Sequence, residues 1–262
     1  MFAEERQQKI YDIICKKRSV KVSELSKMLN ISAVTIRRDL DELQKQNRII
    51  RTHGGAMVAY SVGRAIKWKD LISQNSELKQ KIAHVAYDQI CEHDTILLDS
   101  SSTVYELVKL IAQGNKGNLR IITTSILAVQ ALSNCKNCNV MIVGGDINYN
   151  HDTVEGCVAA RFIKDIRVDK CFIGINGIDE KFGFSTPRYE DAEIKSSMIA
   201  SSVKSFILAD HTKFGKVYLA KVDPCSCLIT DCKVPDFSYN LLEKKTDIIF
   251  ADETVESGGE SD

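Results

Sequence analysis

Apolar residues recur with helical spacing through the first 46 positions of the chain. Ile10 and Ile14 lie on one side of the stretch 4–17, which predicts a helix with a single buried stripe. The same spacing predicts a second helix at 22–29 and a third at 32–46, with a very short connection between them. We therefore expect three small helices around one apolar core.

The third predicted helix has distinct apolar and polar sides. At an advance of about 100° per residue, Ile36, Leu40 and Leu43 fall within about 60° of one another. Arg38 falls on the opposite side. Ser32 precedes the helix and is a good N-cap candidate, because its hydroxyl can accept from the free N–H groups of the first turn.

A short β-prone run follows the third helix and ends in the pair Gly54-Gly55, which permits a tight turn. We interpret residues 47–56 as a wing beside the helices. The stretch 58–75 has no strong period, and we interpret it as a linker.

Beyond Ser76, short apolar β-rich runs alternate with helical stretches, which is typical of a mostly parallel sheet covered on both faces. The seven predicted strands are 95–98, 120–122, 140–143, 171–175, 206–209, 227–229 and 247–250. The predicted helices are 77–91, 103–113, 125–133, 155–164 and 190–203. The tail 251–262 holds five acids and no base and is predicted to be disordered.

Charge is unevenly distributed, although 35 Lys and Arg balance 35 Asp and Glu overall. Residues 1–70 hold 15 basic and 8 acidic side chains, and the remainder holds 20 and 27. A basic segment is typical of a protein that binds a phosphate backbone, and a merely solvated surface is the alternative. Because no apolar run approaches the roughly 18 residues of a membrane span and no signal peptide is evident, we expect a cytoplasmic protein.

Nine cysteines in a chain without a secretory signal are expected to be reduced thiols. Two groups could in principle supply thiolates to zinc: the pair Cys135 and Cys138, and the trio Cys225, Cys227 and Cys232. No His lies at zinc-knuckle spacing beside either group. We therefore expect half-buried thiols, no metal and no cofactor.

Two helices joined by a tight turn suit the DNA major groove when the second exposes basic residues. The first two turns of the second helix can contact base edges and phosphates, and the wing can reach the DNA backbone or the minor groove. The expected DNA-binding residues are Ser32, Thr35, Arg37, Arg38, Arg48, Arg51 and His53. The acids Asp39, Asp41 and Glu42 would oppose DNA if they faced it. A basic helix that binds another protein is the alternative.

Hydroxyl-rich and glycine-rich loops follow several predicted strands. Asp99–Thr103 reads Asp-Ser-Ser-Ser-Thr between a strand and a helix start, where free N–H groups and the helix dipole favour a phosphate. The alternative is that these serines merely cap the helix. Thr123–Ser125 repeats the pattern, and glycines at 144–145 and 174–177 let the backbone approach a ligand at strand ends.

The stretch Val22–Ala56 resembles the winged helix-turn-helix of the DeoR family of bacterial transcriptional regulators, above all in Thr35–Leu40 (Thr-Ile-Arg-Arg-Asp-Leu) and His53–Ala56 (His-Gly-Gly-Ala). The resemblance continues to about residue 250. It implies the fold class α/β, with an N-terminal winged helix-turn-helix domain over 1–57 and a mostly parallel-sheet α/β sensor domain over 76–250, related to ribose-5-phosphate isomerase. It also implies a repressor of a carbohydrate-metabolism operon, controlled by a phosphorylated sugar.

The resemblance further implies that the chain forms a homo-oligomer on double-stranded operator DNA. The implied effector-binding residues are Asp99, Ser100, Ser101, Ser102, Thr103, Thr123, Thr124, Ser125, Gly144, Gly145, Asn176, Gly177 and Lys213. Many family members have Gly in place of Ser101 and Asn in place of Thr124, so loop shape and ligand choice can differ here.

An enzyme is the other alternative. The acid, base and electrophile of an aldose to ketose proton transfer could come from Asp99, Glu190, Lys195 and Lys213. The Gly-rich stretch that precedes the isomerase's catalytic Glu is, however, replaced by 184–189 (Phe-Ser-Thr-Pro-Arg-Tyr). We therefore expect a sensor without catalytic residues. No residue encodes the direction of the effector response.

Overall fold

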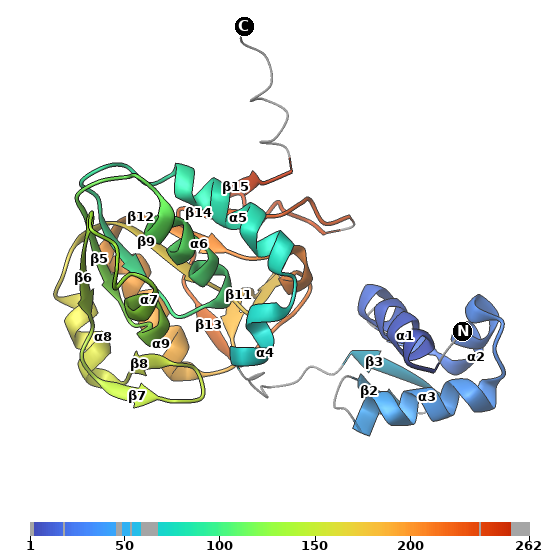
Figure 1. Ribbon diagram of the computed structural model, residues 1–262. Helices are drawn as coiled ribbons and strands as arrows, with labels where there is room; N and C mark the ends of the chain where they lie inside the picture. The colour runs from blue at the N-terminus through green and yellow to red at the C-terminus, as the bar shows by residue number, and fades with distance from the viewer. Residues whose placement is uncertain are drawn as a thin grey trace, which may run out of the picture. The chain divides into compact units, whose positions relative to one another are not determined.

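The computed structural model describes residues 3–17, 19–45, 49–52, 54–58, 68–235 and 237–252. Contacts between residues divide the chain into two units, Met1–Val62 and Gly63–Asp262, each with its own apolar clusters (Figure 1). The division falls inside the segment 58–75, where the sequence predicts a linker. Within that segment the structure describes Val58 and the residues from 68 on, which include the short helix α4 (Trp68–Ser73).

The first unit combines three helices with a three-stranded antiparallel sheet. Its elements are α1 (Ala3–Lys17), β1 (Ser19–Lys21), α2 (Val22–Leu29), α3 (Ala33–Lys45), β2 (Ile49–Thr52) and β3 (Gly55–Val58). The predicted helices and wing are confirmed, and the wing is the hairpin β2–β3, to which β1 adds a strand. Ile36, Leu40 and Leu43 of α3 are fully buried in one cluster with Ile10 and Ile14 of α1.

The turn between α2 and α3 is as short as the sequence predicts. Asn30 ends α2 with a left-handed backbone (φ 53°), and the backbone N–H of Ile31 donates to the carbonyl of Ser26. Ser32 then caps α3, because its hydroxyl accepts from the backbone N–H of Thr35 at 3.2 Å.

The second unit is built on a seven-stranded sheet in which all pairings are parallel. Its strands are β4 (Thr95–Leu98), β5 (Leu119–Thr123), β6 (Cys138–Ile142), β9 (Val168–Gly174), β12 (Ser202–Leu208), β14 (Cys227–Thr230) and β15 (Asp247–Phe250). These are the seven strands that the sequence predicts, so the parallel α/β fold is confirmed.

Helices cover both faces of this sheet. They are α5 (Ser76–Asp88), α6 (Ser102–Gln113), α7 (Ile126–Ala131), α8 (Cys157–Lys164) and α9 (Tyr189–Ser201). Along β4, Ile96 and Leu98 belong to the apolar cluster of α5, α6 and α7, whereas Leu97 belongs to the cluster of α8 and α9. No helix in the described part of the chain is long and apolar enough to cross a bilayer.

The order of the strands reverses next to β4. Across the sheet the order is β15-β14-β12-β9-β4-β5-β6, so the chain runs outward from β4 through β5 to β6, then returns to β9 on the other side of β4. Parallel sheets bind ligands outside the carboxyl ends of the strands at such a reversal. The pair β4–β9 therefore marks the position where a ligand site is expected.

Besides β1 and α4, several short elements are absent from the sequence prediction. They are the hairpin β7 (Asp146–Asn148) and β8 (Thr153–Glu155), the antiparallel strands β10 (Gly177–Asp179), β11 (Gly183–Thr186) and β13 (Ala220–Val222), and the 3-10 helix η1 (His211–Lys213). Each has only three or four residues, which is too few for a period to be recognised.

Two expectations need correction. The ordered chain extends past 250, because the backbone N–H of Ala251 donates to the carbonyl of Thr230 and that of Asp252 to Asp231; residues 253–262 lie outside the described part. Cys135 and Cys138 form a disulfide rather than two free thiols. The turn before β6 brings their Cα atoms to 5.6 Å, within the range that a disulfide requires.

Asp39 of α3 is a buried acid with its own counter-ion. Its carboxylate, 3% exposed, accepts from the Arg6 guanidinium of α1 at 2.6 and 3.0 Å. Arg6 is 19% exposed, so this ion pair is mostly withdrawn from water. The pair fixes α3 to α1.

Replacing Arg6 with Met should destabilise the first unit, because the Asp39 charge would stay buried without its partner. We expect a loss of about 2–3 kcal/mol, somewhat below the cost of breaking a fully buried pair. Hydrogen exchange of the α3 amides in the full chain measures it. The control is Lys17→Met, which breaks the exposed Lys17–Glu24 pair and should cost little, because solvent screens that pair. Equal losses of protection in the two variants would contradict the assignment.

Candidate functional site

The exposed face of α3 carries most of the predicted DNA-binding residues. Ser32, Arg37 and Arg38 are exposed, as is Val34, whose side chain is 73% accessible. Thr35 is half-buried, and its hydroxyl lies 2.9 Å from that of Ser32. The face therefore offers two guanidinium groups and an apolar side chain to a partner.

Arg51 of the wing is held by α3. Its Nη1 donates to the Asp41 carboxylate and to the backbone carbonyl of Arg37, each at 3.0 Å. Glu42 pairs with Lys45 at 2.8 Å, so each acid of α3 that the sequence marks as unfavourable for DNA has a cationic partner. Arg48 and His53 lie outside the described residues.

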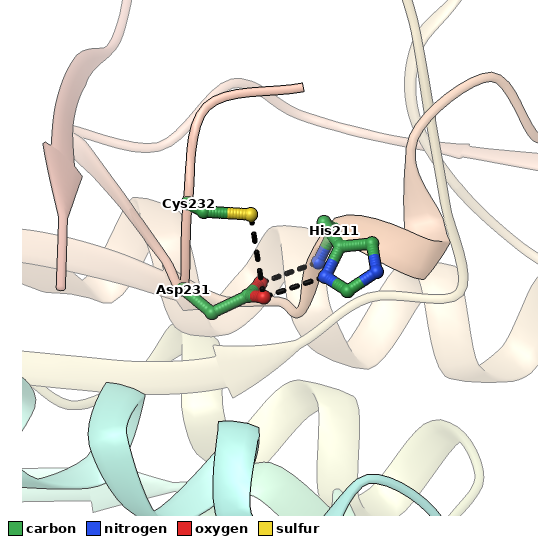
Figure 2. Close-up of side chains that lie close together, drawn as sticks. All are labelled: His211, Asp231 and Cys232. Atoms are coloured by element: carbon green, nitrogen blue, oxygen red, sulfur yellow. Dashed lines mark hydrogen bonds and ion pairs between the residues drawn. The ribbon is translucent and has the colours of Figure 1, made fainter. Parts of the chain in front are cut away.

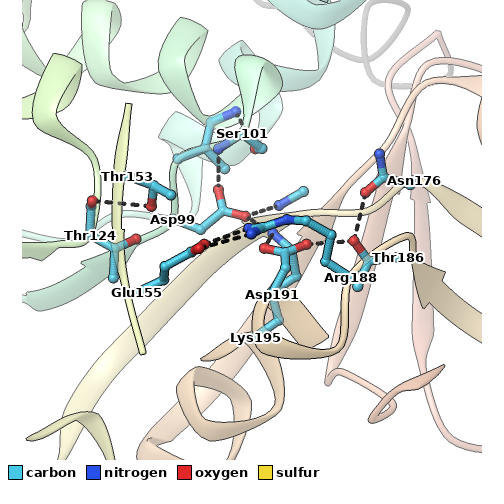
Figure 3. Close-up of polar contacts among 12 residues, drawn as sticks. Asp99, Ser101, Thr124, Thr153, Glu155, Asn176, Thr186, Arg188, Asp191 and Lys195 are labelled. Atoms are coloured by element: carbon cyan, nitrogen blue, oxygen red, sulfur yellow. Dashed lines mark hydrogen bonds and ion pairs between the residues drawn. The ribbon is translucent and has the colours of Figure 1, made fainter. Parts of the chain in front are cut away.

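At the reversal of strand order, the Asp99 carboxylate joins three segments of the chain (Figure 3). Its Oδ1 accepts from the backbone N–H of Ser101 at 2.8 Å. Its Oδ2 accepts from the backbone N–H of Gly174 at 2.8 Å and from Lys195 Nζ at 2.5 Å. Asp99 is 3% exposed, so it organises the loop from within the protein.

Gly174 lies at the end of β9, against the loop that follows β4. A Cβ at this position would lie 2.4 Å from the side chain of Ser101. Glycine is therefore required at position 174 for the two strand ends to approach each other. The sequence indicates only a glycine-containing loop here, and the structure gives the physical reason for the glycine.

Lys195 of α9 is the buried cation of the site. Its Nζ also lies 3.3 Å from Asp191 Oδ1, one turn earlier on the helix. Burial alone would lower the pKa of Lys195, but the carboxylates of Asp191 and Asp99 raise it above its ordinary value. Lys195 therefore carries its charge at neutral pH and is neutralised by two acids.

Asp191 connects this cation to a second loop. The hydroxyl of Thr186 lies against the Asp191 carboxylate and 2.9 Å from the side-chain oxygen of Asn176, a residue that the sequence predicts for the pocket (Figure 3). Neighbouring Gly177 permits close packing, because a Cβ there would lie 2.5 Å from the carbonyl of Lys216.

The N-terminus of α6 lies beside Asp99. Ser101 caps the helix, because its hydroxyl accepts from the backbone N–H of Val104 at 3.2 Å. In the described chain, the backbone N–H groups of Ser102 and Thr103 donate to no protein acceptor. Ser100 and Ser102 are half-buried and Thr103 is buried. This arrangement leaves two N–H groups for an anion.

The polar groups of the second hydroxyl loop, 123–125, already form hydrogen bonds within the protein. Thr123 donates to the carbonyl of Leu98 at 2.8 Å, and Ser125 caps α7 by accepting from the N–H of Ala128 at 3.2 Å. The carbonyl of Thr124 accepts from the hydroxyl of Thr153 at 3.2 Å. All three residues of 123–125 are buried, so their described contacts position the loop and the β7–β8 hairpin.

A second ion pair closes the site from the hairpin side. Arg188 Nη1 and Nη2 donate to the two carboxylate oxygens of Glu155 at 2.9 and 2.5 Å. Asn148 also donates to Glu155, at 3.0 Å. His151, in the hairpin turn, interacts electrostatically with Arg188 and Glu155. Burial, together with the positive charge of Arg188, holds the pKa of His151 below its ordinary value.

The remaining predicted positions differ in their surroundings. Gly145 brings the end of β6 onto β8, since a Cβ there would lie 2.7 Å from the carbonyl of Glu155, whereas Gly144 is exposed with open space around it. Lys213 interacts electrostatically with Asp210 and Lys79, and no described contact joins it to Asp99.

The sequence therefore identifies the loops of this site but not its ion pairs. Lys195 enters the sequence argument only as a possible catalytic group, and Arg188 only as a departure from the isomerase. Glu155 carries no signal at all. A hollow of about 330 Å³ lies on the opposite face of α9, lined by Tyr189, Glu193 and neighbouring residues, and it contains none of these charges.

Comparison with known families gives an independent assignment. A model of the DeoR-like helix-turn-helix domain matches residues 6–62, and a model of the DeoR C terminal sensor domain matches residues 74–232. Together they span both units of the structure.

Curated relatives match along nearly the whole chain. An uncharacterized HTH-type transcriptional regulator of Bacillus subtilis, YulB, is 33% identical and covers 94% of this chain and 95% of its own. The transcriptional repressor GlcR of Bacillus subtilis is 31% identical (93% and 94%). The glycerol-3-phosphate regulon repressor of Escherichia coli is 28% identical (88% and 92%).

Among solved structures, ribose 5-phosphate isomerase A of Methanocaldococcus jannaschii matches with a TM-score of 0.41 and 16% identity, over 55% of this chain and 56% of its own. That similarity is too distant to bear on function. The three relatives that match along nearly the whole chain are named as transcriptional regulators or repressors and not as enzymes. The chain belongs to the DeoR family of transcriptional regulators.

Proposed function

We propose that this regulator binds operator DNA through α3 and the wing, and that a phosphorylated sugar bound at the carboxyl ends of β4 and β9 controls it. Relatives named as repressors favour a repressor of a carbohydrate-metabolism operon. One of those names contains a phosphorylated polyol, glycerol 3-phosphate. A protein that regulates transcription must reach the chromosome, so we place it in the cytoplasm.

The observation that carries the effector proposal is the meeting of an open helix N-terminus with two cations at the reversal of strand order. The N–H groups of Ser102 and Thr103 can donate to phosphate oxygens, and the helix dipole favours a negative charge there. Lys195 and Arg188 supply positive charge, and the Asp191 carboxylate acts on both of them.

Arg188 could exchange its present partner, the Glu155 carboxylate, for a phosphate group of the effector. A phosphate group offers a guanidinium the same two-oxygen geometry that Glu155 offers now. An effector that takes over Arg188 releases Glu155 and with it the β7–β8 hairpin. Binding then differs between two arrangements of the protein, which is the condition for an effector to shift an equilibrium.

A second group of charges connects the sensor unit to the segment before it. Lys79 of α5 donates to the backbone carbonyl of Leu71 in α4, and it interacts with Asp210 and Lys213. Burial, together with the charge of Lys213, lowers the pKa of Lys79 to about 8. We propose that movement of this group on effector binding reaches the residues of 58–75 through α4.

The regulator should work as a homo-oligomer, because winged helix-turn-helix units bind repeated half-sites in pairs. The edge strand β6 and the adjacent β7 hairpin expose a run of large apolar side chains. These are Met141, Ile142, Ile147 and Tyr149, which are 43%, 44%, 49% and 82% accessible. An unpaired sheet edge with apolar side chains suits contact with a second copy of the chain.

Replacing Arg38 with Ala should weaken operator binding by about 1–3 kcal/mol if the guanidinium reads a base edge. Gel shift on the upstream region of the chain's own operon measures the loss. Lys9→Ala, an exposed substitution on α1, is the control and should bind normally. Unchanged affinity in Arg38→Ala would remove this residue from the contact set. A wild-type chain that does not bind the fragment would favour a protein-binding adaptor.

A thermal-shift screen across phosphorylated sugars tests the effector site. A ligand at about 100 times its dissociation constant should raise the melting temperature by about 5–10 °C. Arg188→Ala should reduce the shift, because the phosphate loses its bidentate partner, whereas the exposed Arg161→Ala should retain it. Equal shifts with unphosphorylated sugars would contradict an anion site.

Replacing Ile142 with Lys should lower the oligomeric state, since a charge would be introduced into the proposed contact. Light scattering coupled to size-exclusion chromatography measures the mass in solution. Leu219→Lys alters another exposed apolar residue, 60% accessible, and should leave the mass unchanged. If Ile142→Lys keeps the wild-type mass, the interface lies elsewhere.

A further inference from the structure

Three metal-ligating side chains converge at a place that the effector proposal does not use. His211 begins η1 after β12, and Asp231 and Cys232 follow β14, the neighbouring strand of the sheet. Their potential donor atoms all lie within 4.8 Å of one another (Figure 2). The three residues come from two loops that are separated by about 20 positions in sequence, so the fold rather than local sequence brings them together.

The Asp231 carboxylate is oriented from within the protein. The residue is 4% exposed, and its Oδ1 accepts from the backbone N–H of His211 at 2.6 Å. Its Oδ2 lies 2.5 Å from His211 Nδ1 and 3.6 Å from Cys232 Sγ. One oxygen is thus fixed by the backbone, and the other lies between an imidazole nitrogen and a thiol (Figure 2). Outer hydrogen bonds of this kind hold a metal ligand in place.

We propose that His211 Nδ1, Asp231 Oδ2 and Cys232 Sγ bind a divalent transition-metal ion of the zinc type, with water as the fourth ligand. Nitrogen, sulfur and carboxylate oxygen together favour zinc over magnesium or calcium, which take oxygen ligands. A thiolate and a carboxylate also balance the two positive charges of the ion. Binding displaces two protons. The thiol proton leaves to solvent as the Cys232 sulfur bonds to the metal, and the proton that His211 Nδ1 shares with Asp231 moves by way of solvent to Nε2, which frees the Nδ1 lone pair.

Metal binding requires a small rearrangement of these side chains. For zinc bonds of about 2.0–2.3 Å, tetrahedral donor atoms lie roughly 3.3–3.8 Å apart. His211 Nδ1 and Asp231 Oδ2 must therefore separate by roughly 1 Å. The imidazole can make this movement, because its side chain is 43% exposed.

The bound ion would tie the loop after β12 to the loop after β14. Its ligands are not part of the Asp99 and Arg188 contacts, so the site can be tested without any effector or DNA. Failure of this proposal would leave the proposed function untouched, and the reverse also holds.

Cobalt(II) titration of the full-length chain tests the site, because cobalt in a tetrahedral thiolate site shows sulfur-to-metal charge transfer and intense visible bands. We expect one equivalent of cobalt to give both signals and one equivalent of zinc to remove them. Cys232→Ser should abolish the charge-transfer band, and His211→Ala should weaken metal affinity at least tenfold. Cys157→Ser, which removes an exposed thiol of the same unit, should behave as wild type.

The titration is run in a phosphine reductant, which reduces Cys135 and Cys138 and makes them possible competitors. A chain with Cys135→Ser and Cys138→Ser should therefore keep the full signal. Absence of charge transfer in the wild-type chain, or its persistence in Cys232→Ser, would overturn the proposal. Thermal unfolding without metal shows whether each variant is folded, and a folded Cys232→Ser chain that still binds one equivalent of cobalt with wild-type affinity would also overturn it.

Discussion

The sensor unit depends on one carboxylate, that of Asp99. It accepts from the backbone N–H groups of Ser101 and Gly174 and from the ammonium of Lys195, and so connects β4, β9 and α9. Since β4 and β9 flank the reversal of strand order, this residue sets the distance between the two loops that border the proposed ligand site. The absence of a side chain at 174 is part of the same constraint, because Ser101 occupies that space.

Counter-ions that are already in place constrain what the proposed site can bind. Lys195 is neutralised by Asp99 and Asp191, and Arg188 by Glu155, so an anionic ligand competes with carboxylates already in place. A weakly charged or single-oxygen ligand gains little from replacing the bidentate Glu155 contact. A phosphate reproduces it and also meets the open N–H groups of α6. In the proposed site, these acids would favour a ligand that offers two oxygens, and they pair with Lys195 and Arg188 when no ligand is bound.

The sequence predicts the frame of the molecule because that frame is set by local periodicity. Runs such as 96–98 and 206–209 are apolar throughout, as strands covered on both faces must be, and the Ile36, Leu40 and Leu43 stripe follows directly from the helical repeat. The three-residue strands and the Cys135–Cys138 disulfide have no comparable local signal. The ion pairs have none either, since Asp99 and Lys195 are 96 positions apart and Glu155 and Arg188 are 33 apart.

Ion pairs between distant residues also matter in the first unit, where the summed charge of α3 does not describe the charge that the helix exposes at its surface. Asp39 is withdrawn against Arg6, and Asp41 is engaged by Arg51 of the wing. These ion pairs neutralise two negative charges of the helix, so the exposed side chains of Arg37 and Arg38 dominate the charge of its outer face. A phosphate backbone interacts with the charges that remain free at the surface. Asp39 and Asp41 therefore fix α3 to α1 and to the wing, and their pairing would allow α3 to approach DNA as proposed.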